Sequence, residues 1–386
     1  MGNRTTISAT EVAQYVRYDS CDRRLRLSYD DRQAAKDTVP FAEQFFNPLD
    51  PVLQRTAARH EDTWADRLRS RGYTELNREY NEYGDPDELV EEDGQIIAKA
   101  FDWEDDHSAE AVETEKRENS EENQSRGFRA CLRDVEPEKP LFAREVEIRG
   151  TIGAFDVTGR MDFVIVLWEN GDPRLRVVET KSSRKEKTNQ RIQVAIYEIL
   201  LGQALNEEPL HIGTESAEPS TIGPNAIECT VGRIEESTNE LQDLLQLDAA
   251  TLVQEREDVQ ELLKPGGVVE DVVNTPQDEI DSLDYKLESK CDQCVFDVHC
   301  FPESARQRKL ELLGLDPTTI ERFAEAGGPD EGIENIDDLA EINLDSTVAE
   351  ELRSADNVRE DIGQLRQAAR SRRQNLPGDT PEDEYE

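Results

Sequence analysis

Apolar and polar residues alternate along this chain with two different periods. In residues 8–29 and 52–71 the apolar positions recur at helical spacing, and Ser8 or Thr10 can cap the first of these two predicted helices. From residue 141 the period falls to two, which is typical of half-buried strands. Successive antiparallel strands are predicted for "FAREVEIRG", "FDVTGRMDFVIVLW" and "RLRVVETK", with "ENGD" (169–172) as the hairpin turn between the last two.

Helical periods return after these strands. Residues 188–205 predict an amphipathic helix, residues 226–231 another strand, and residues 234–263 a further helical stretch. Residues 304–344 predict several short helices. Strands accompanied by helices in this order indicate an α/β fold, with a mixed sheet flanked by helices and a small helical C-terminal extension.

Acidic segments mark the predicted domain boundaries. Residues 84–123 hold 16 Asp or Glu in 40 positions, and we interpret them as a solvated insertion in which only "GQIIAKAFDW" resembles a strand. The end of the chain, "NLPGDTPEDEYE", is predicted to be a disordered acidic tail. The predicted organisation is a main domain over 1–303, a helical segment over 304–345 and a helical and acidic tail over 346–386.

The composition adds an unusual charge to this picture. The 386 residues include 87 Asp and Glu against 45 Lys and Arg, which gives a formal net charge of −42 spread along the whole chain. Such charge is typical of disordered proteins, but also of proteins adapted to molar salt, where ions screen the self-repulsion. The regular apolar elements favour a folded protein from a halophile. The charge does not exclude nucleic-acid binding, because molar salt removes most phosphate attraction in any case.

No segment of the sequence predicts a membrane protein. The longest apolar run, "FVIVLW", is far shorter than a membrane span, and the first residues lack the apolar region of a signal peptide. Gly2 followed by Thr6 matches a myristoylation pattern only weakly. We expect a soluble, cytoplasmic protein.

Two acidic residues and a lysine are predicted to meet at one end of the strand pair. Glu179 and Lys181 point the same way, because side chains alternate along a strand, and Asp162 can lie opposite them on the partner strand. Two crowded carboxylates need a cation between them, and oxygen ligands suit Mg²⁺ or Mn²⁺. An isolated Glu-x-Lys would be a surface salt bridge, so the surrounding residues decide.

Those surroundings resemble a known family. "GRMDFV" and "VVETKSS" resemble the Asp…(Asp/Glu)-x-Lys core of the PD-(D/E)xK nucleases, which have a restriction-endonuclease-like fold, and specifically their RecB-like type. That type adds a glutamine and a tyrosine on one helix face, matched by Gln193 and Tyr197, and an upstream histidine, matched by His60 in "ARHEDTWADRL". Met161 stands where the family pattern has proline, but the Gly-x-x-Asp of RecB-like members is present from Gly159.

The resemblance implies a catalytic role for the matched residues. A divalent metal would polarise the scissile phosphate and acidify a water molecule. Lys181 would position or deprotonate that water and neutralise the developing charge. The implied metal ligands are Asp162, Glu179, His60 and the carbonyl of Thr180.

The resemblance also implies contacts to the substrate. Gln193 would orient Lys181 or the substrate backbone, and Tyr197 would contact the nucleic-acid strand. Ordinary packing between helix and sheet is the alternative for both residues, and it fits Tyr197 nearly as well. A basic cluster follows the lysine and would meet phosphates, although a polar loop between strand and helix explains it too. The cluster consists of Arg184, Lys185, Lys187 and Arg191.

Four of the six cysteines form a second constellation. "CDQCVFDVHC" spaces Cys291, Cys294 and Cys300 as Cys-x2-Cys-x5-Cys, which in an intracellular chain favours a metal site over disulfides. A tetrahedral site needs a fourth ligand, and Cys21 is the natural one, with His299 the alternative for zinc. The spacing alone permits zinc as well as an iron–sulfur cluster.

The resemblance to the same family favours an iron–sulfur cluster over zinc. The arrangement resembles iron–sulfur RecB-like nucleases, among them the AddB helicase–nucleases and the CRISPR adaptation nucleases, and Pro302 after the last cysteine fits as well. A [4Fe–4S] cluster is therefore implied, and it would staple the two ends of the nuclease domain, so its loss should loosen that domain. Cys229 lies in a strand-like run and is expected to be a small core residue, and Cys131 has no partner pattern.

The segment after the cysteines carries one weaker resemblance. Residues 310–343 resemble a degenerate helix-hairpin-helix unit, which grips a DNA backbone through turn amides, but a helical cap without that function fits equally well. With no P-loop sequence there is no built-in motor. We therefore expect a metal-dependent DNA nuclease, acting on single strands or ends as an exonuclease in repair, recombination or CRISPR-type adaptation. The alternatives are a nucleic-acid-binding protein that does not cut and a structural metal module.

Overall fold

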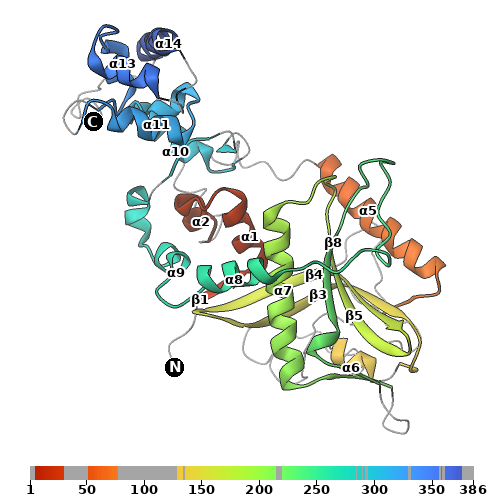
Figure 1. Ribbon diagram of the computed structural model, residues 1–386. Helices are drawn as coiled ribbons and strands as arrows, with labels where there is room; N and C mark the ends of the chain where they lie inside the picture. Colours follow the sequence, from red (N-terminus) through yellow and green to blue (C-terminus); the bar gives the residue numbers. More distant parts are fainter. Residues whose placement is uncertain are drawn as a thin grey trace, which may run out of the picture. The chain divides into compact units, whose positions relative to one another are not determined.

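The fold is seen in a computed structural model whose contacts group the chain into two units (Figure 1). The sheet unit comprises residues 1–20 and 49–274, and the cysteine unit comprises residues 21–48 and 275–386. The residues described are 5–29, 51–76, 128–133, 135–213, 220–283, 285–288, 290–291, 294–328, 332–355, 358 and 361–375. The predicted insertion at 84–123, with its strand "GQIIAKAFDW", and the tail from residue 376 lie outside them.

A mixed sheet forms the centre of the sheet unit. Its strands are ordered β2-β3-β4-β5-β8, and β1 pairs with β4. The three predicted antiparallel strands are confirmed as β3, β4 and β5, and Asn170 and Gly171, both with positive φ, make the predicted hairpin turn. The strands are β1 (Thr5–Ser8), β2 (Thr74–Glu75), β3 (Leu141–Ile152), β4 (Phe155–Glu169), β5 (Asp172–Thr180) and β8 (Ile227–Gly232).

Strand β4 is long enough to hold two different partners along one of its sides. Its first residues pair with β1, as far as Ser8 opposite Thr158, and its later residues pair with β5, starting at Phe163 opposite Val178. On that side, residues 159–162 therefore lie in a fork between β1 and β5, while β3 runs along the other side. This fork contains Asp162.

Helices cover both faces of the sheet. Helix α7 (Thr188–Glu207) contacts β3, β4, β5 and β8 and lies across the sheet in Figure 1, with α1 (Ala9–Arg17) and α8 (Val253–Leu262) packed against it. Helix α5 (Pro51–Ser70) packs Trp64 and Leu68 on Phe163 and its neighbours. Smaller elements complete the unit: α6 (Phe128–Leu132), the β6–β7 pair (Leu210–Ile212, Ser220–Ile222), η1 (Pro224–Ala226) and α9 (Val268–Val273).

Two of the helix predictions, for residues 8–29 and 188–205, were wrong in part. The helix predicted over 8–29 divides into α1 and α2 (Asp22–Tyr29), because Asp19 and Ser20 adopt left-handed φ angles that end the first helix; its predicted cap Ser8 is confirmed. Helix α7 is confirmed, but it is not amphipathic, since the sheet covers one side of it and α1 and α8 the other.

The helix predicted over 234–263 begins only at Val253. The preceding segment carries leucines at helical spacing, but they pack irregularly against α5 and the sheet. Side chains take the backbone carbonyls that a helix would use: Trp64 donates to Gln242 O (2.9 Å) and Arg176 to Leu244 O (3.1 Å). Tertiary contacts therefore replace helical hydrogen bonds here.

The cysteine unit is helical, as predicted for its later part. A core of its own gathers around Phe323, Ile336, Leu339 and Leu352. Its helices are α2, η2 (Gln277–Ser282), α10 (Asp297–Gln307), η4 (Leu310–Leu313), α11 (Pro317–Glu325), α12 (Ile336–Glu341), α13 (Thr347–Ser354) and α14 (Ile362–Asn375). The domain boundaries at 303 and 345 stay predictions.

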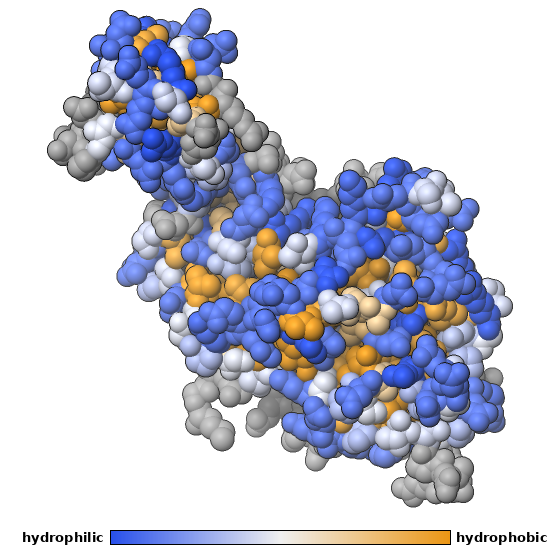
Figure 2. All heavy atoms as spheres, viewed as in Figure 1, coloured by the Kyte–Doolittle hydropathy of each residue, from blue (hydrophilic) through white to orange (hydrophobic). Residues whose placement is uncertain are grey.

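The visible surface is mainly hydrophilic, with smaller hydrophobic areas between the hydrophilic ones (Figure 2). This agrees with the mean hydropathy of −0.77. Among the described helices, none is both long and apolar enough to cross a membrane.

Candidate active site and cysteine site

Asp162 and Glu179 are neighbours across the β4–β5 pair. The ladder ends with Phe163 opposite Val178, so the next residue on each strand is Asp162 and Glu179 respectively. Thr180 then fixes Asp162 from the partner strand: its backbone N–H donates to Oδ2 at 2.6 Å and its hydroxyl to the same oxygen at 2.8 Å. The predicted juxtaposition of the two acids is confirmed.

Lys181 lies next to the two acids. Its ammonium forms an ion pair with Oε1 of Glu179, and its backbone N–H donates to Gly232 O (2.8 Å), which fixes the end of β5 against β8. Glu179 is 2% exposed, and its second oxygen, Oε2, is buried without a hydrogen-bond partner. A buried carboxylate oxygen with no donor is costly unless a proton or a cation reaches it.

Burial and mutual repulsion govern the ionisation of these groups. Burial, followed by the charge of Asp162, raises the pKa of Glu179 to about 8, and burial also raises the pKa of Asp162. Burial acts to lower the pKa of Lys181, but the charges of Glu179 and Asp162 outweigh it and leave that pKa raised. The lysine therefore stays charged, and the two acids hold a proton near neutral pH unless another cation replaces it.

Helix α5 adds His60 and a further acid. His60 Nδ1 is 3.3 Å from Ser182 Oγ, just beyond Lys181, and its ring meets Trp64 edge-on. The neighbouring Glu61 has its pKa raised to about 7, first by burial and then by the charge of Asp162. The predicted histidine helix thus approaches the strand ends, and Glu61 joins the site although it was not among the predicted ligands.

A fourth acid, Glu145, was missed by the sequence analysis. It lies on β3 between the paired residues Arg144 and Val146, whose partners Phe163 and Met161 flank Asp162 on β4. Its φ of 52° is left-handed, which is rare for a side chain other than glycine and recurs at functional sites. Its charge acts on both Asp162 and Glu61. The register of "FAREVEIRG" against "GRMDFV" is the signal that would have revealed it.

Gln193 and Tyr197 lie inside the interface between α7 and the sheet. Gln193 Nε2 donates to the Tyr197 hydroxyl (2.8 Å), and that hydroxyl donates to Arg160 O (2.8 Å), inside the fork of β4. Tyr197 is 0% exposed, and its ring is so close that a Cβ added to Gly159 would lie 2.6 Å from it. This burial is what the packing alternative expects.

The basic cluster is only partly available at the surface. Arg184 is exposed and donates to Asn239 Oδ1 (2.6 Å), and Lys185 and Lys187 are exposed. Arg191 instead pairs with Glu255 and Glu186 and donates to Thr251 O. Its charge is therefore already balanced within the protein.

A comparison with protein families shows to which family the chain belongs. The model of the PD-(D/E)XK nuclease superfamily matches residues 6–301, about three quarters of the sequence. The chain belongs to the PD-(D/E)XK nuclease superfamily. Members of this superfamily are nucleases that use divalent metals such as Mg²⁺ or Mn²⁺, so nucleic acid is the expected class of substrate.

Two further comparisons add little to this assignment. The solved structure titled "Crystal structure of SSO0001" is 15% identical and covers 78% of this chain, and 88% of that chain is covered. The TM-score is 0.30, which is too low for the likeness to carry an argument. The search of curated proteins found no match to this chain.

The acidic site around Asp162 and Glu179 fits a divalent cation in its chemistry. Glu179 Oε2 is a buried acceptor without a donor, and its neighbour Asp162 supplies further oxygen, the donor type that Mg²⁺ and Mn²⁺ prefer. Among the residues that the structure describes, no three His, Cys, Asp or Glu side chains are already arranged as a metal site. The positive charge beside these carboxylates is the Lys181 ammonium, which is paired with Glu179.

The four cysteines of the predicted metal site all belong to the cysteine unit. Burial raises the pKa of Cys21 and of Cys294, and it raises that of Cys300 to about 12. The charges of Cys291 and Cys294 act on both Cys21 and Cys300, although 270 residues separate the first from the second. Among the described residues the thiols are not arranged as a metal site. No cysteine is in a disulfide among the described residues.

Contacts other than the cysteines bring Cys21 to the later segment. Arg23, only 1% exposed, forms an ion pair with Glu303 on α10, donates to Leu283 O (3.2 Å) and stacks on the ring of Tyr285 at 4.1 Å. Beside it, an apolar cluster of Leu27, Ile280 and Phe296 includes Cys294 at its edge. The remaining two cysteines, Cys131 and Cys229, are buried, and burial raises the pKa of Cys229 far above its usual value, as expected for small core residues.

Proposed function

We propose that this protein is a metal-dependent DNA nuclease of the RecB-like type that hydrolyses phosphodiester bonds. The observation that carries the proposal is the Asp162–Glu179–Lys181 constellation: two adjacent acids, of which Glu179 is buried with one oxygen lacking a donor, and a charged lysine paired to its other oxygen. A surface salt bridge would not need a glutamate that is 2% exposed or an aspartate fixed by two hydrogen bonds.

Each residue of the site has a role in this proposal. Asp162, Glu179 and His60, with the carbonyl of Thr180, would hold a divalent metal, which supplies Lewis acidity to the phosphate and an acidified water. Lys181 holds its proton and its charge close to Glu179, where it orients the water and balances negative charge on the phosphate. Gln193 donates to the Tyr197 hydroxyl, which in turn donates to the Arg160 carbonyl, so the pair shapes the fork that contains Asp162. Tyr197 also acts on Glu179, whose pKa it lowers against the larger effect of burial.

The proposed substrate is DNA with a free single strand or end, cut by an exonuclease. Three exposed basic residues follow the end of β5 and would contact phosphates. They are Arg184, Lys185 and Lys187. Arg191 contributes less than the sequence predicted, since Glu255 and Glu186 already neutralise it. The acidic remainder of the surface fits a protein of a halophilic cell's cytoplasm, where molar salt screens its repulsion of DNA.

For the cysteine unit we propose a [4Fe–4S] cluster on Cys21, Cys291, Cys294 and Cys300. The four cysteines belong to one unit and their charges act on one another, which supports four-cysteine ligation, and the resemblance to RecB-like nucleases favours iron–sulfur over zinc. The test is anaerobic purification with measurement of iron, sulfide and zinc in one sample. Four irons and four sulfides per chain are expected; one zinc without sulfide would refute the cluster but not the nuclease.

The nuclease proposal is tested with the purified protein in molar KCl with Mn²⁺. Linear single-stranded, linear double-stranded and circular single-stranded DNA are compared, with RNA of the same sequence as a further substrate. We expect linear single strands to be degraded and circles to resist. Cleavage of circles would refute exonuclease action, and no cleavage of any substrate would refute the proposed function.

A further inference from the structure

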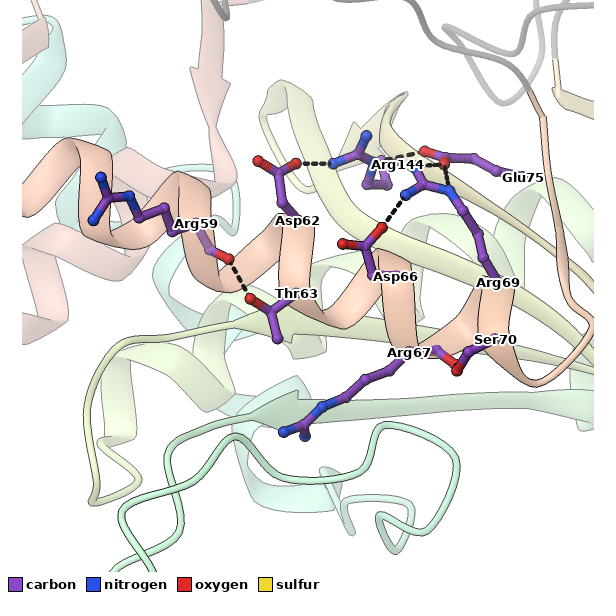
Figure 3. Close-up of polar contacts among 9 residues, drawn as sticks. All are labelled: Arg59, Asp62, Thr63, Asp66, Arg67, Arg69, Ser70, Glu75 and Arg144. Atoms are coloured by element: carbon purple, nitrogen blue, oxygen red, sulfur yellow. Dashed lines mark hydrogen bonds and ion pairs between the residues drawn. The ribbon is translucent and has the colours of Figure 1, made fainter.

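An ionic network joins helix α5 to the strands beneath it (Figure 3). Arg144 on β3 donates from Nη1 to Asp62 Oδ1 on α5 (3.0 Å) and from Nε to Glu75 Oε1 on β2 (2.7 Å). Glu75 also accepts from Arg69 of α5 (2.8 Å), and Arg69 in turn pairs with Asp66 (2.6 Å). A single guanidinium, Arg144, therefore touches both the helix and the neighbouring strand.

The burial of this network is uneven. The side chains of Arg144 and Glu75 are 3% and 9% exposed, whereas those of Asp62 and Asp66 are 59% and 73% exposed. Buried ion pairs add little net stability over apolar packing, so a buried arginine with directed partners is better explained by the geometry that it enforces. A guanidinium fixes two acceptors in defined directions, which an apolar side chain cannot do.

The position of the network connects it to the acidic site. Asp62 follows His60 and Glu61 on α5, and Arg144 precedes Glu145 on β3. The Arg144 contact to Asp62 thus joins the two elements whose acids, Glu61 and Glu145, act on Asp162. The charge of Arg144 also acts on Glu61, where it opposes the effect of burial on the pKa of that acid.

We propose that Arg144 is a positioning residue of the nuclease site: through Asp62 it sets α5 so that His60 and Glu61 face the carboxylates of β4 and β5. This inference rests on the proposed function. Residues that orient metal ligands without touching the metal commonly contribute 10- to 100-fold to metal affinity or activity, and an effect of roughly that size is expected here.

The sharpest test compares Asp62→Asn with Asp66→Asn. Both residues are exposed aspartates on α5 that pair with an arginine, but only Asp62 contacts Arg144. In Asp62→Asn we expect the Mn²⁺ dissociation constant, measured by paramagnetic resonance without DNA, to rise about 10-fold, and kcat to fall with KM for DNA unchanged. Asp66→Asn should stay within about twofold of wild type in both measurements.

A second variant separates geometry from charge. Arg144→Lys keeps the positive charge but cannot bond two acceptors in fixed directions, so it should weaken Mn²⁺ binding about as much as Asp62→Asn. Thermal melting of each variant gives the folded fraction to which the binding data are normalised. If folded Asp62→Asn binds Mn²⁺ and cuts DNA like wild type, the positioning role is wrong while the nuclease stands. If wild type itself neither binds Mn²⁺ nor cuts, both proposals fall.

Discussion

Thr180 donates two hydrogen bonds to one oxygen of Asp162, from its backbone N–H at 2.6 Å and from its hydroxyl at 2.8 Å. Asp162 lies on β4 where neither β1 nor β5 continues the ladder, so this pair of bonds closes the fork that the strands leave open. The same contact sets the distance between Asp162 and Glu179, because Thr180 follows Glu179 on β5.

Thr180→Val should destabilise the metal-free protein by about 1–3 kcal/mol, because it removes the hydroxyl donor to a charged acceptor and keeps the shape. Urea unfolding measures the loss. Thr180→Ser restores a hydroxyl and should recover most of the stability. Equal midpoints for the valine variant and wild type would show that the hydroxyl bond is unimportant.

The raised pKa values predict how stability depends on pH without metal. Glu179 titrates at about 8 in the folded state and at about 4.5 when unfolded, so its contribution to stability is complete below pH 4.5 and is lost as pH rises through 8. Glu61, at about 7, acts in the same direction. The metal-free protein should therefore unfold at lower urea concentration at pH 9 than at pH 6.

Mn²⁺ should cancel this loss, because it replaces the protons on the two acids, and its affinity should rise with pH over the same interval. Glu179→Gln is the control: without a titrating group at this position, the metal-free stability should fall less between pH 6 and 9. A Mn²⁺ affinity that is constant over this interval would contradict the assigned ionisation of the site.

Gly159→Ala should destabilise the sheet unit by about 1–3 kcal/mol, since the added Cβ would lie 2.6 Å from Cε1 of Tyr197 in a closed core. A double-mutant cycle with Tyr197→Leu tests the cause, because the smaller side chain should remove most of the effect. Additive losses would mean that the two residues do not interact as described.

Arg23→Leu should open the cysteine unit. Removing one member of a buried ion pair costs about 3–5 kcal/mol, and here it also removes the stack on Tyr285. Bound iron or zinc per chain should fall with it. Arg306→Leu, an exposed arginine on the same helix α10 as Glu303, should change neither stability nor metal content. Unchanged metal content in Arg23→Leu would refute this role.

Asp162, Glu179 and Lys181 could be predicted from the sequence because each depends on local geometry. A two-residue turn fixes the register of β4 and β5, and alternation along the strands fixes which side chains share a face. The grouping of four cysteines by spacing and resemblance stays a prediction, since no three His, Cys, Asp or Glu side chains of the described residues are arranged as a metal site.

Features that depend on distant pairing could not be predicted. The fork in β4 requires β1, which precedes it by about 150 residues, and Glu145 enters the site only through the register of β3. In the sequence Arg144 is one more polar residue on a strand, and only its contact with Asp62 of α5 shows its position in the site. The leucines of 241–247 are the opposite case. Their spacing predicts a helix, but they pack irregularly against α5 and the sheet.

In the proposed mechanism Lys181 acts in the cleavage step itself, whereas Asp162 and Glu179 hold the metal. The most direct test of this mechanism measures single-turnover cleavage of a linear single-stranded oligonucleotide with Mn²⁺ in molar KCl, for wild type and Lys181→Met, beside Mn²⁺ binding by both. We expect a cleavage rate at least about 10²-fold lower in the variant, with Mn²⁺ binding intact. A variant that binds Mn²⁺ and cuts as fast as wild type would contradict this mechanism.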